Sequence, residues 1–204
     1  MSSHKPRLER IVVADDEMLV AEFIVDILRE LEYRVIATVP DGVQAVDACR
    51  REGPDMALLD IHMPRMNGIE AARQIWGELH VPVVIISAYS DQEYARATSE
   101  IGVFGYLLKP TSRDYLRTTL TVAWGQYLAS LDKKDKIARL EQRLEDRKEI
   151  ERAKWFLVQQ LSISEDDAMK KLQKQARDNR RTLVDVARGI LENQELFGGE
   201  ARSA

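Results

Sequence analysis

Short apolar runs recur along the first half of the chain, and between them apolar residues return every three or four positions. The runs Ile11–Ala14, Met56–Leu59 and Val83–Ile86 contain no polar residue. Unbroken apolar runs of this length are typical of parallel strands that are buried on both faces of a sheet. The three- and four-residue spacing predicts amphipathic helices between these strands.

Two further strands are expected, at Arg34–Val39 and at Tyr106–Leu108. Ser90 and Thr111, each followed three residues later by an acidic side chain, predict the starts of the fourth and fifth helices. The first helix is expected over residues 18–31, with an apolar face made of Leu19, Phe23, Ile24, Ile27, Leu28 and Leu31. Five βα units with right-handed crossovers give an α/β fold with a flavodoxin-like, five-stranded parallel sheet.

The fifth helix is expected to continue well beyond this sheet. Between Thr111 and Glu151 there is no proline, and Gly125 is the only glycine. The apolar residues Ile137, Leu140 and Leu144 follow the spacing of a coiled-coil seam. A charged helix with one apolar stripe is stable mainly when it is paired, which favours a parallel homodimer. A lone charged linker helix is the alternative.

The last part of the chain predicts a small all-α three-helix bundle. Ser164 and Thr182, each followed three residues later by an aspartate, mark the starts of its second and third helices. The expected organisation is a sheet domain over residues 1–125, a helical coiled-coil linker over 126–148 and the bundle over 149–204.

Polar side chains suited to metal and phosphate stand at the ends of the predicted strands: Asp15, Asp16, Asp60, Ser87 and Lys109. Parallel strands end at one edge of a sheet, so these groups are expected to lie together. Three clustered carboxylates repel one another unless a cation lies among them, and their hard oxygen atoms suit Mg²⁺. A hydroxyl and an ammonium group beside Mg²⁺ would complete a site for a phosphoryl group on Asp60.

Each of these residues also has a simpler interpretation. Asp15 and Asp16 could cap the first helix, and Ser87 could bond a neighbouring backbone group. Lys109 could be a surface lysine before Pro110. We favour the shared site because four strand ends carry the required group at once.

The same residues, with Met63-Pro64, Gly68, Ala88 and Pro110, resemble the receiver domain of two-component response regulators over roughly the first 125 residues. The resemblance implies that Asp60 is the phosphoacceptor and that a sensor histidine kinase is the phosphodonor. It also implies that Ser87 and Lys109 contact the phosphoryl oxygens, and that Tyr106 is an aromatic switch residue.

The metal ligands implied by this resemblance are Asp16 and Asp60, which would bind Mg²⁺ directly, and Asp15, which would hold a metal-bound water. The backbone carbonyl of His62 would be a further ligand. The His62 side chain either influences the access of water to the phosphoryl group or has no role.

The tail resembles the ANTAR domain, an RNA-binding antitermination module, over roughly Glu149–Leu191. The residues that carry this resemblance are Ala153, Lys154, Leu157, Ala168, Leu172, Asn179, Val186 and Ala187. Trp155 replaces the small residue usual in that family, and it is either a stacking platform for a base or a core aromatic. Cations that hold phosphates and amides that read base edges suit RNA loops, and we expect the RNA contacts at Lys154, Arg177, Asn179 and Arg180.

Composition narrows the class of protein further. The chain has 204 residues, of which 45% are hydrophobic, and a single cysteine, so no disulfide can form within it. The longest apolar stretch, Val81–Ala88, contains a proline and is too short to span a bilayer, so we expect a cytoplasmic protein without a membrane anchor. The net charge is −6 over residues 1–125 and +2 over the rest, which suits a polyanionic partner for the tail.

The predicted function is that of a phosphorylation-controlled response regulator, not an enzyme, that acts as a transcription antiterminator by binding RNA hairpins. The alternative keeps the receiver and gives the helical tail DNA or a protein as its partner. A third class, a phosphatase with Asp60 as nucleophile, is disfavoured because His62 stands where a general acid would be expected.

Overall fold

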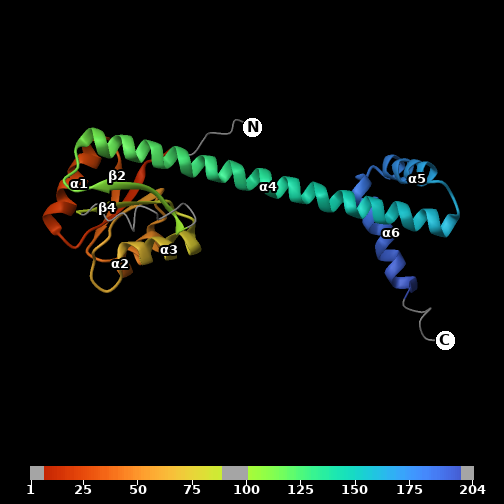
Figure 1. Cartoon of the computed structure of the whole chain (residues 1–204), viewed down its shortest axis with the longest axis horizontal. Coiled ribbons are helices and arrows are strands. Elements are labelled where there is room, and N and C mark those ends of the chain that lie inside the picture. Colours follow the sequence, from red (N-terminus) through yellow and green to blue (C-terminus); the bar gives the residue numbers. More distant parts are fainter. Residues whose placement is uncertain (1–6, 89–100, 199–204) are drawn as a thin grey trace. The chain divides into compact units, whose positions relative to one another are not determined.

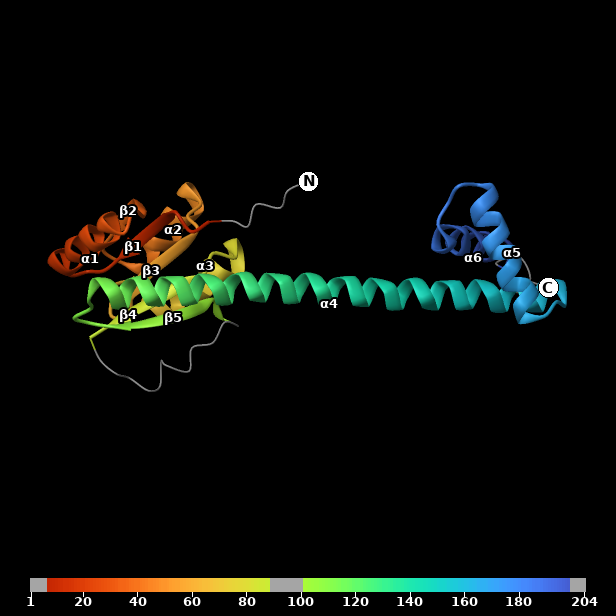
Figure 2. The ribbon, with the colours of Figure 1, turned by 90° about the horizontal axis from the view of Figure 1, so that it is seen from above.

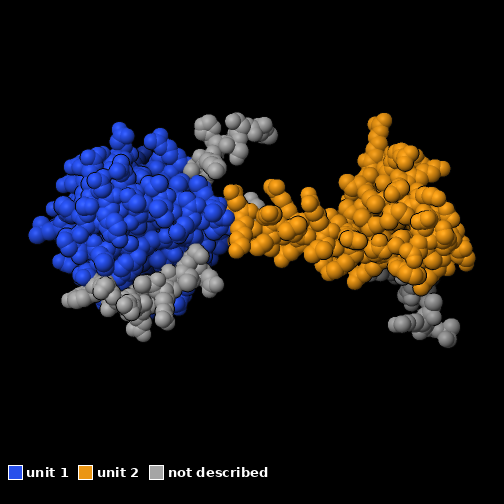
Figure 3. Space-filling model, turned by 45° about the horizontal axis from the view of Figure 1, so that its top comes forward, with its two compact units in different colours: residues 1–131 blue, residues 132–204 orange. Residues whose placement is uncertain are grey.

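The computed structural model describes the chain over residues 7–88 and 101–198. The chain divides into two compact units, residues 1–131 and residues 132–204 (Figure 3). None of the described helices is long and apolar enough to cross a membrane.

The first unit is built on a five-stranded parallel sheet (Figure 1). Its strands are β1 (Arg10–Ala14), β2 (Arg34–Val39), β3 (Met56–Asp60), β4 (Val83–Ser87) and β5 (Val103–Leu108). They lie in the order β2-β1-β3-β4-β5, so the chain adds strands first to one side of β1 and then to the other. This order confirms the predicted flavodoxin-like sheet, whose switch point lies between the carboxyl ends of β1 and β3.

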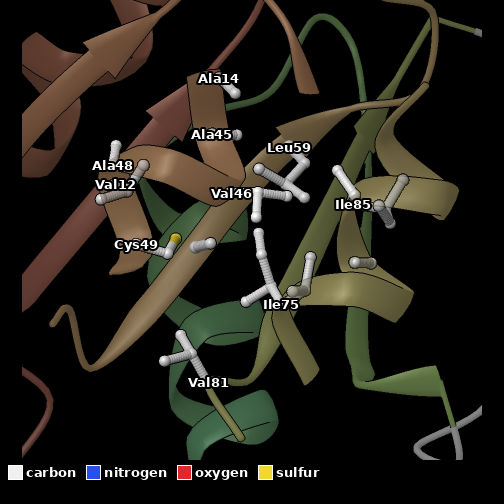
Figure 4. Close-up of a cluster of buried hydrophobic side chains, with 14 of the residues drawn as sticks. Val12, Ala14, Ala45, Val46, Ala48, Cys49, Leu59, Ile75, Val81 and Ile85 are labelled. Carbon is white, nitrogen blue, oxygen red and sulfur yellow. The ribbon is translucent and has the colours of Figure 1, made fainter. Parts of the chain in front are cut away.

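Helices cover both faces of this sheet (Figure 1). One face carries α2 (Gly42–Glu52) and α3 (Gly68–Leu79), and the other carries α1 (Met18–Glu30) and the first part of α4 (Arg113–Leu161). Figure 4 shows the core beneath α2 and α3, which includes Val12, Val46, Leu59, Ile75 and Ile85. Every residue of β3 and β4 is buried, as expected for strands with helices on both faces.

The apolar face predicted for α1 is partly wrong. Leu19 and Phe23 are exposed, with 81% and 52% of their surface accessible. The helix buries Ala21, Ile24, Val25, Ile27 and Leu28, so Ile24, Ile27 and Leu28 of the predicted face are confirmed. Leu19 and Phe23 belong to the neighbouring face, which turns away from the sheet.

The predicted helix starts have different outcomes. Ser90 lies outside the described residues. The cap predicted at Thr111 is wrong by one residue. The hydroxyl of Ser112 caps the helix instead, because it accepts the hydrogen bond from the N–H of Tyr115 at 3.3 Å.

The second unit is a three-helix bundle made by the end of α4, α5 (Glu165–Asp178) and α6 (Leu183–Gly198) (Figure 2). Both predicted caps are confirmed: the hydroxyls of Ser164 and Thr182 accept hydrogen bonds from the backbone N–H three residues later. The core of the bundle consists of Ala153, Leu172, Val186 and Ala187, with partly buried neighbours around them. The long helix is also confirmed, because α4 runs without interruption through the predicted linker.

Candidate functional site

Three carboxylates meet at the carboxyl edge of the sheet. Asp15 and Asp16 follow β1, and Asp60 is the last residue of β3, the neighbouring strand. One carboxylate oxygen from each lies within 4.8 Å of the others. Asp15 and Asp60 are buried and Asp16 is exposed, so the cluster has one open side.

Lys109, which directly follows β5, reaches two of these acids. Its Nζ atom lies 2.7 Å from Oδ2 of Asp15 and 2.7 Å from Oδ1 of Asp60. Only 12% of the lysine side chain is exposed, so this ammonium group neutralises its partners in a largely dry setting. The structure thus brings Lys109 and the three acids together as predicted.

The environment shifts the pKa values of two of these groups. Burial raises the pKa of Asp15, against the opposing effect of its contact with Lys109. Burial alone would lower the pKa of Lys109, but its contacts with Asp15 and Asp60 outweigh that effect and raise it. Lys109 is therefore held in its charged form beside Asp60.

Capping of the first helix does not account for the geometry of Asp15. The first helix begins after Glu17, whose side chain makes no capping hydrogen bond. Asp15 accepts a hydrogen bond from the N–H of Glu17 through Oδ1, at 3.0 Å, but its Oδ2 points toward Lys109.

Ser87 lies at the same edge of the sheet, whereas Tyr106 lies in the neighbouring strand, opposite Ile85 and two residues before the strand ends. Ser87 ends β4 and is fully buried, and its carbonyl accepts a hydrogen bond from the N–H of Lys109 at 2.8 Å. Tyr106 lies in β5 and is half-buried against the core beneath α2 and α3. Ser87 is therefore bonded directly to Lys109, and Tyr106 lies three residues before Lys109 along the chain.

His62 lies in the loop that follows Asp60. Its backbone N–H donates a hydrogen bond to Oδ2 of Asp60 at 2.7 Å, while its side chain is exposed. The two oxygens of Asp60 therefore have different partners, Lys109 on Oδ1 and this N–H on Oδ2.

The acidic cluster fits a divalent cation. Oδ2 of Asp15 is buried and accepts no well-aligned hydrogen bond from the described residues, although Lys109 lies close to it. An oxygen left in this state at the centre of a carboxylate cluster is suited to a metal-bound water or a cation. Asp15, Asp16 and Asp60 are the residues that could hold Mg²⁺.

In the second unit, the last turn of α5 and the residues that follow it carry three of the four predicted RNA contacts. Arg177, Asn179 and Arg180 are all exposed there. Asn179 is the C-cap residue directly after α5, and Arg180 follows with a φ of +52°. The N–H groups of Arg180 and Arg181 bond back to carbonyls of the last helical turn, at 3.2 and 2.9 Å. This is a left-handed helix cap, a place where glycine is the usual residue.

Lys154, the fourth predicted contact, has a different environment. Its ammonium group lies 2.6 Å from Glu151 and 2.9 Å from Glu165, and 12% of the side chain is exposed. Because Glu165 is the first residue of α5, this lysine connects α4 to the start of that helix. In this structure its charge is neutralised within the bundle.

Trp155 lies on the surface of the bundle. Half of its side chain is exposed, and it is not part of the bundle core, where its neighbour Ala153 is fully buried. Of the two interpretations of Trp155, the surface position agrees with a platform for an unstacked base and not with a core aromatic.

Two parts of the chain match known protein families. Residues 11–121, which are more than half of the chain, match the response regulator receiver domain. The chain belongs to the response regulator family. Residues 138–191 match the ANTAR domain. A receiver domain followed by an ANTAR domain makes this response regulator an RNA-binding antiterminator.

Similar proteins match either most of this chain or about half of it. The transcriptional regulatory protein PdtaR of Mycobacterium tuberculosis is 33% identical over 183 residues, which cover 90% of this chain and 89% of PdtaR. The transcriptional regulatory protein DegU of Brevibacillus brevis is 38% identical over 109 residues, covering 52% of this chain and 46% of DegU.

Solved receiver domains superpose on the first unit. The signal receiver domain of the putative response regulator NarL from Mycobacterium tuberculosis has a TM-score of 0.54 and 32% identity, covering 59% of this chain and 99% of that domain. The receiver domain of the sensor histidine kinase PA1611 from Pseudomonas aeruginosa has a TM-score of 0.52 and 31% identity, covering 58% and 99%. That domain has a magnesium ion coordinated in its active-site cleft.

Sequence reasoning missed two residues that bear on this site. Asp41 and Arg65 form an ion pair between the start of α2 and the loop after Asp60. The dipeptide Asp41-Gly42 signals a turn, but nothing in the sequence links it to an arginine 24 residues later.

Proposed function

We propose that Asp60 accepts a phosphoryl group from the phosphohistidine of a sensor kinase, and that this transfer controls the binding of RNA hairpins by the second unit. The observation that supports phosphorylation is the convergence of Asp60 with Lys109 and two further carboxylates at one edge of the sheet. The protein would then act as a regulated binding module and not as an enzyme with its own turnover.

In the transfer, a carboxylate oxygen of Asp60 forms a bond to phosphorus while the bond between phosphorus and the histidine nitrogen breaks, and that nitrogen keeps the electron pair. Mg²⁺, when bound, would neutralise negative charge on the phosphoryl oxygens. Lys109, already beside Oδ1 of Asp60, would pair with the phosphoryl charge, and the hydroxyl of Ser87 would donate a hydrogen bond to a phosphoryl oxygen. The aromatic ring of Tyr106 would then move inward.

The proposed metal ligands are Asp16 and Asp60 directly, Asp15 through a water, and the backbone carbonyl of His62. The open side of the cluster at Asp16 supports this assignment, because a metal and a phosphodonor both need access. The position of His62 supports it as well, since its N–H already bonds Asp60.

The RNA contact is proposed at the turn between α5 and α6. The first turn of α5 is acidic, with Glu165, Asp166 and Asp167, whereas its later part is basic, with Lys170, Lys171, Lys174 and Arg177. RNA phosphates are repelled by the first end and attracted to the second. Arg180 adds support, because a left-handed position occupied by arginine in place of glycine indicates a use for the side chain.

Lys154 could contact RNA only if the RNA replaced Glu151 and Glu165 as the ion-pair partners of its ammonium group. The salt bridges to Glu151 and Glu165 argue that its first role is within the bundle. Trp155 is proposed as a stacking platform because its indole is half exposed.

The protein is further proposed to be a cytoplasmic homodimer with three parts: a receiver over residues 1–125, a coiled-coil linker over 126–148 and an RNA-binding domain over 149–204. The exposure of Ile137, Leu140 and Leu144 supports pairing through the linker, because large apolar residues repeated on one helix face are stabilised by a partner helix.

The test is RNA binding by the full chain before and after phosphorylation with acetyl phosphate and Mg²⁺. Phosphorylation is expected to strengthen the binding of a hairpin RNA by about 5- to 150-fold, the usual range of an allosteric coupling. A scrambled RNA and a DNA duplex serve as competitors. Preference for the duplex, or equal binding of all three, would contradict the proposal and favour another partner for the tail.

A further inference from the structure

The loop after the phosphoacceptor, residues 61–67, is connected to the start of α2 by an ion pair between a half-exposed arginine and a buried aspartate. The guanidinium of Arg65 contacts the carboxylate of Asp41, which is 1% exposed. Asp41 also caps α2, since it accepts hydrogen bonds from the backbone N–H and the side-chain amide of Gln44, at 2.9 and 2.7 Å. One carboxylate thus joins a helix start to the phosphorylation loop.

A backbone contact lies beside this ion pair. The N–H of Gly42 donates to the carbonyl of Met66 at 3.2 Å. A Cβ atom at Gly42 would lie 2.5 Å from that carbonyl oxygen, so the approach requires glycine. Arg65 adopts a φ of +66°, a conformation that side chains other than glycine, asparagine and aspartate rarely adopt. The far end of the loop is therefore held in one place against α2.

The near end of the loop is held at Asp60. The N–H of Gly68 bonds the carbonyl of Ile61 at 3.0 Å, which closes the loop at its base. A Cβ atom at Gly68 would overlap the backbone carbonyl of Asp60. Between these two ends, the N–H of His62 bonds Oδ2 of Asp60 at 2.7 Å. Movement of the loop therefore changes the environment of the phosphoacceptor.

We propose that the Arg65–Asp41 ion pair is a positioning device for the phosphorylation site. It fixes the loop from its far end, so that the backbone of His62 stays at Asp60 in the orientation that the metal and the phosphoryl group require. Arg65 itself touches neither. The inference rests on the proposed phosphorylation of Asp60, and it adds two residues outside the acidic cluster to the groups that control the reaction.

A purely structural role for Arg65 is less consistent with the contacts. The cap of α2 does not need it, because Gln44 supplies two donors to Asp41. About half of the Arg65 side chain is exposed, so its packing contributes little to the core. What the ion pair adds is a charged connection between α2 and the loop, in a conformation unfavourable for arginine.

The experiment compares the full, unphosphorylated wild-type chain with three variants: Arg65→Met, Asp41→Asn and the double variant. Asn is as good a helix cap as Asp, so Asp41→Asn removes the charge and keeps α2. The affinity for Mg²⁺ is measured by calorimetry, and hydrogen exchange of the His62 amide reports on the loop directly. Each single variant is expected to weaken Mg²⁺ binding about 10-fold, as changes to groups that orient metal ligands do, and to speed exchange at His62.

The double variant is expected to match the single ones, because both substitutions remove the same interaction. Arg65→Lys keeps the charge and is expected to recover most of the Mg²⁺ affinity. The matched control is Arg73→Met, which removes an exposed arginine from α3 and should leave both readouts at wild-type values.

Variants that melt at a lower temperature but keep wild-type Mg²⁺ affinity and His62 exchange would overturn the proposal and leave the pair a structural one. A wild-type chain that binds Mg²⁺ but takes no phosphoryl group from acetyl phosphate would contradict the proposed function instead. Exchange at His62 requires neither metal nor phosphate, so it tests the positioning role in either case.

Discussion

Lys109 Nζ lies 2.7 Å from Oδ1 of Asp60, so the cation expected at the phosphoryl group already contacts the proposed phosphoacceptor. The same ammonium lies 2.7 Å from Asp15. A single lysine thus stabilises two buried carboxylates that would otherwise repel each other. Without the Lys109 ammonium group, the repulsion between Asp15 and Asp60 would destabilise the folded protein.

Lys109→Met should therefore destabilise the receiver in the absence of Mg²⁺. Removing one partner from a largely buried ion pair costs about 3 kcal/mol in the free energy of unfolding. Urea unfolding at neutral pH measures this loss, and added Mg²⁺ should reduce it because the metal supplies the missing positive charge. A variant as stable as the wild type without Mg²⁺ would show that the acids do not need the lysine.

The stability that Lys109 contributes should depend on pH in one direction. Its pKa is raised in the folded state, so its contribution is complete below the unfolded pKa of about 10.4 and is lost as the pH rises through the folded value. The difference in unfolding free energy between the wild type and Lys109→Met should stay constant from pH 7 to 9 and shrink in more alkaline solution. A difference that grows with alkaline pH would contradict the assigned charge state.

Asp60→Asn should abolish phosphorylation by acetyl phosphate and leave the fold intact, because the amide keeps the shape and lacks the nucleophilic oxygen. Incorporation of labelled phosphate measures the effect, and urea unfolding checks the fold. Asp26→Asn, at an exposed aspartate of α1, is the control and should be labelled at the wild-type rate. If Asp60→Asn were labelled as strongly as the wild type, another residue would have to be the phosphoacceptor.

Much of the receiver could be predicted because its signals are local. A run of apolar residues marks a buried strand, and the residue after the run falls at the sheet edge whatever the details of packing. Asp60, Ser87 and Lys109 could therefore be placed together from their positions along the chain. Capping boxes at Ser164 and Thr182 are equally local, since both partners lie within one helical turn.

Features that depend on distant partners could not be predicted. Leu19 and Phe23 have the composition of a core face, but the position of the sheet leaves them exposed. The Arg65–Asp41 ion pair depends on how α2 and α3 pack. Lys154 was expected to be free for RNA, and only the fold reveals that Glu165 from the next helix neutralises it.

The seam of the linker leads to a prediction about assembly. Replacing Ile137, Leu140 and Leu144 together by Gln should dissociate the proposed homodimer, because each of these side chains buried at an interface contributes about 1.5 to 3 kcal/mol. Sedimentation measures the effect. Leu161→Gln, at a similarly exposed leucine outside the seam, is the control and should remain dimeric. An unchanged dimer in the triple variant would place the interface elsewhere.

Arg180→Gly should separate RNA binding from stability. Glycine relieves the left-handed conformation at this position, which costs other residues about 1 to 2 kcal/mol, so the second unit should become more stable. The same substitution removes a cation from the proposed RNA surface. Hairpin affinity should fall, and the slope of log affinity against log salt should decrease by about 0.7 to 0.9, the value of one phosphate contact.

Ser162→Gly is the matched control for this prediction. Ser162 also has a left-handed backbone, with a φ of +51°, directly after α4 ends at Leu161. Glycine there should raise the stability of the bundle by a similar amount and leave both RNA affinity and the salt slope unchanged. Equal RNA affinity for Arg180→Gly and Ser162→Gly would remove Arg180 from the RNA surface. A fall in affinity for both would mean that RNA binding follows the rigidity of the bundle and not the charge at the turn between α5 and α6.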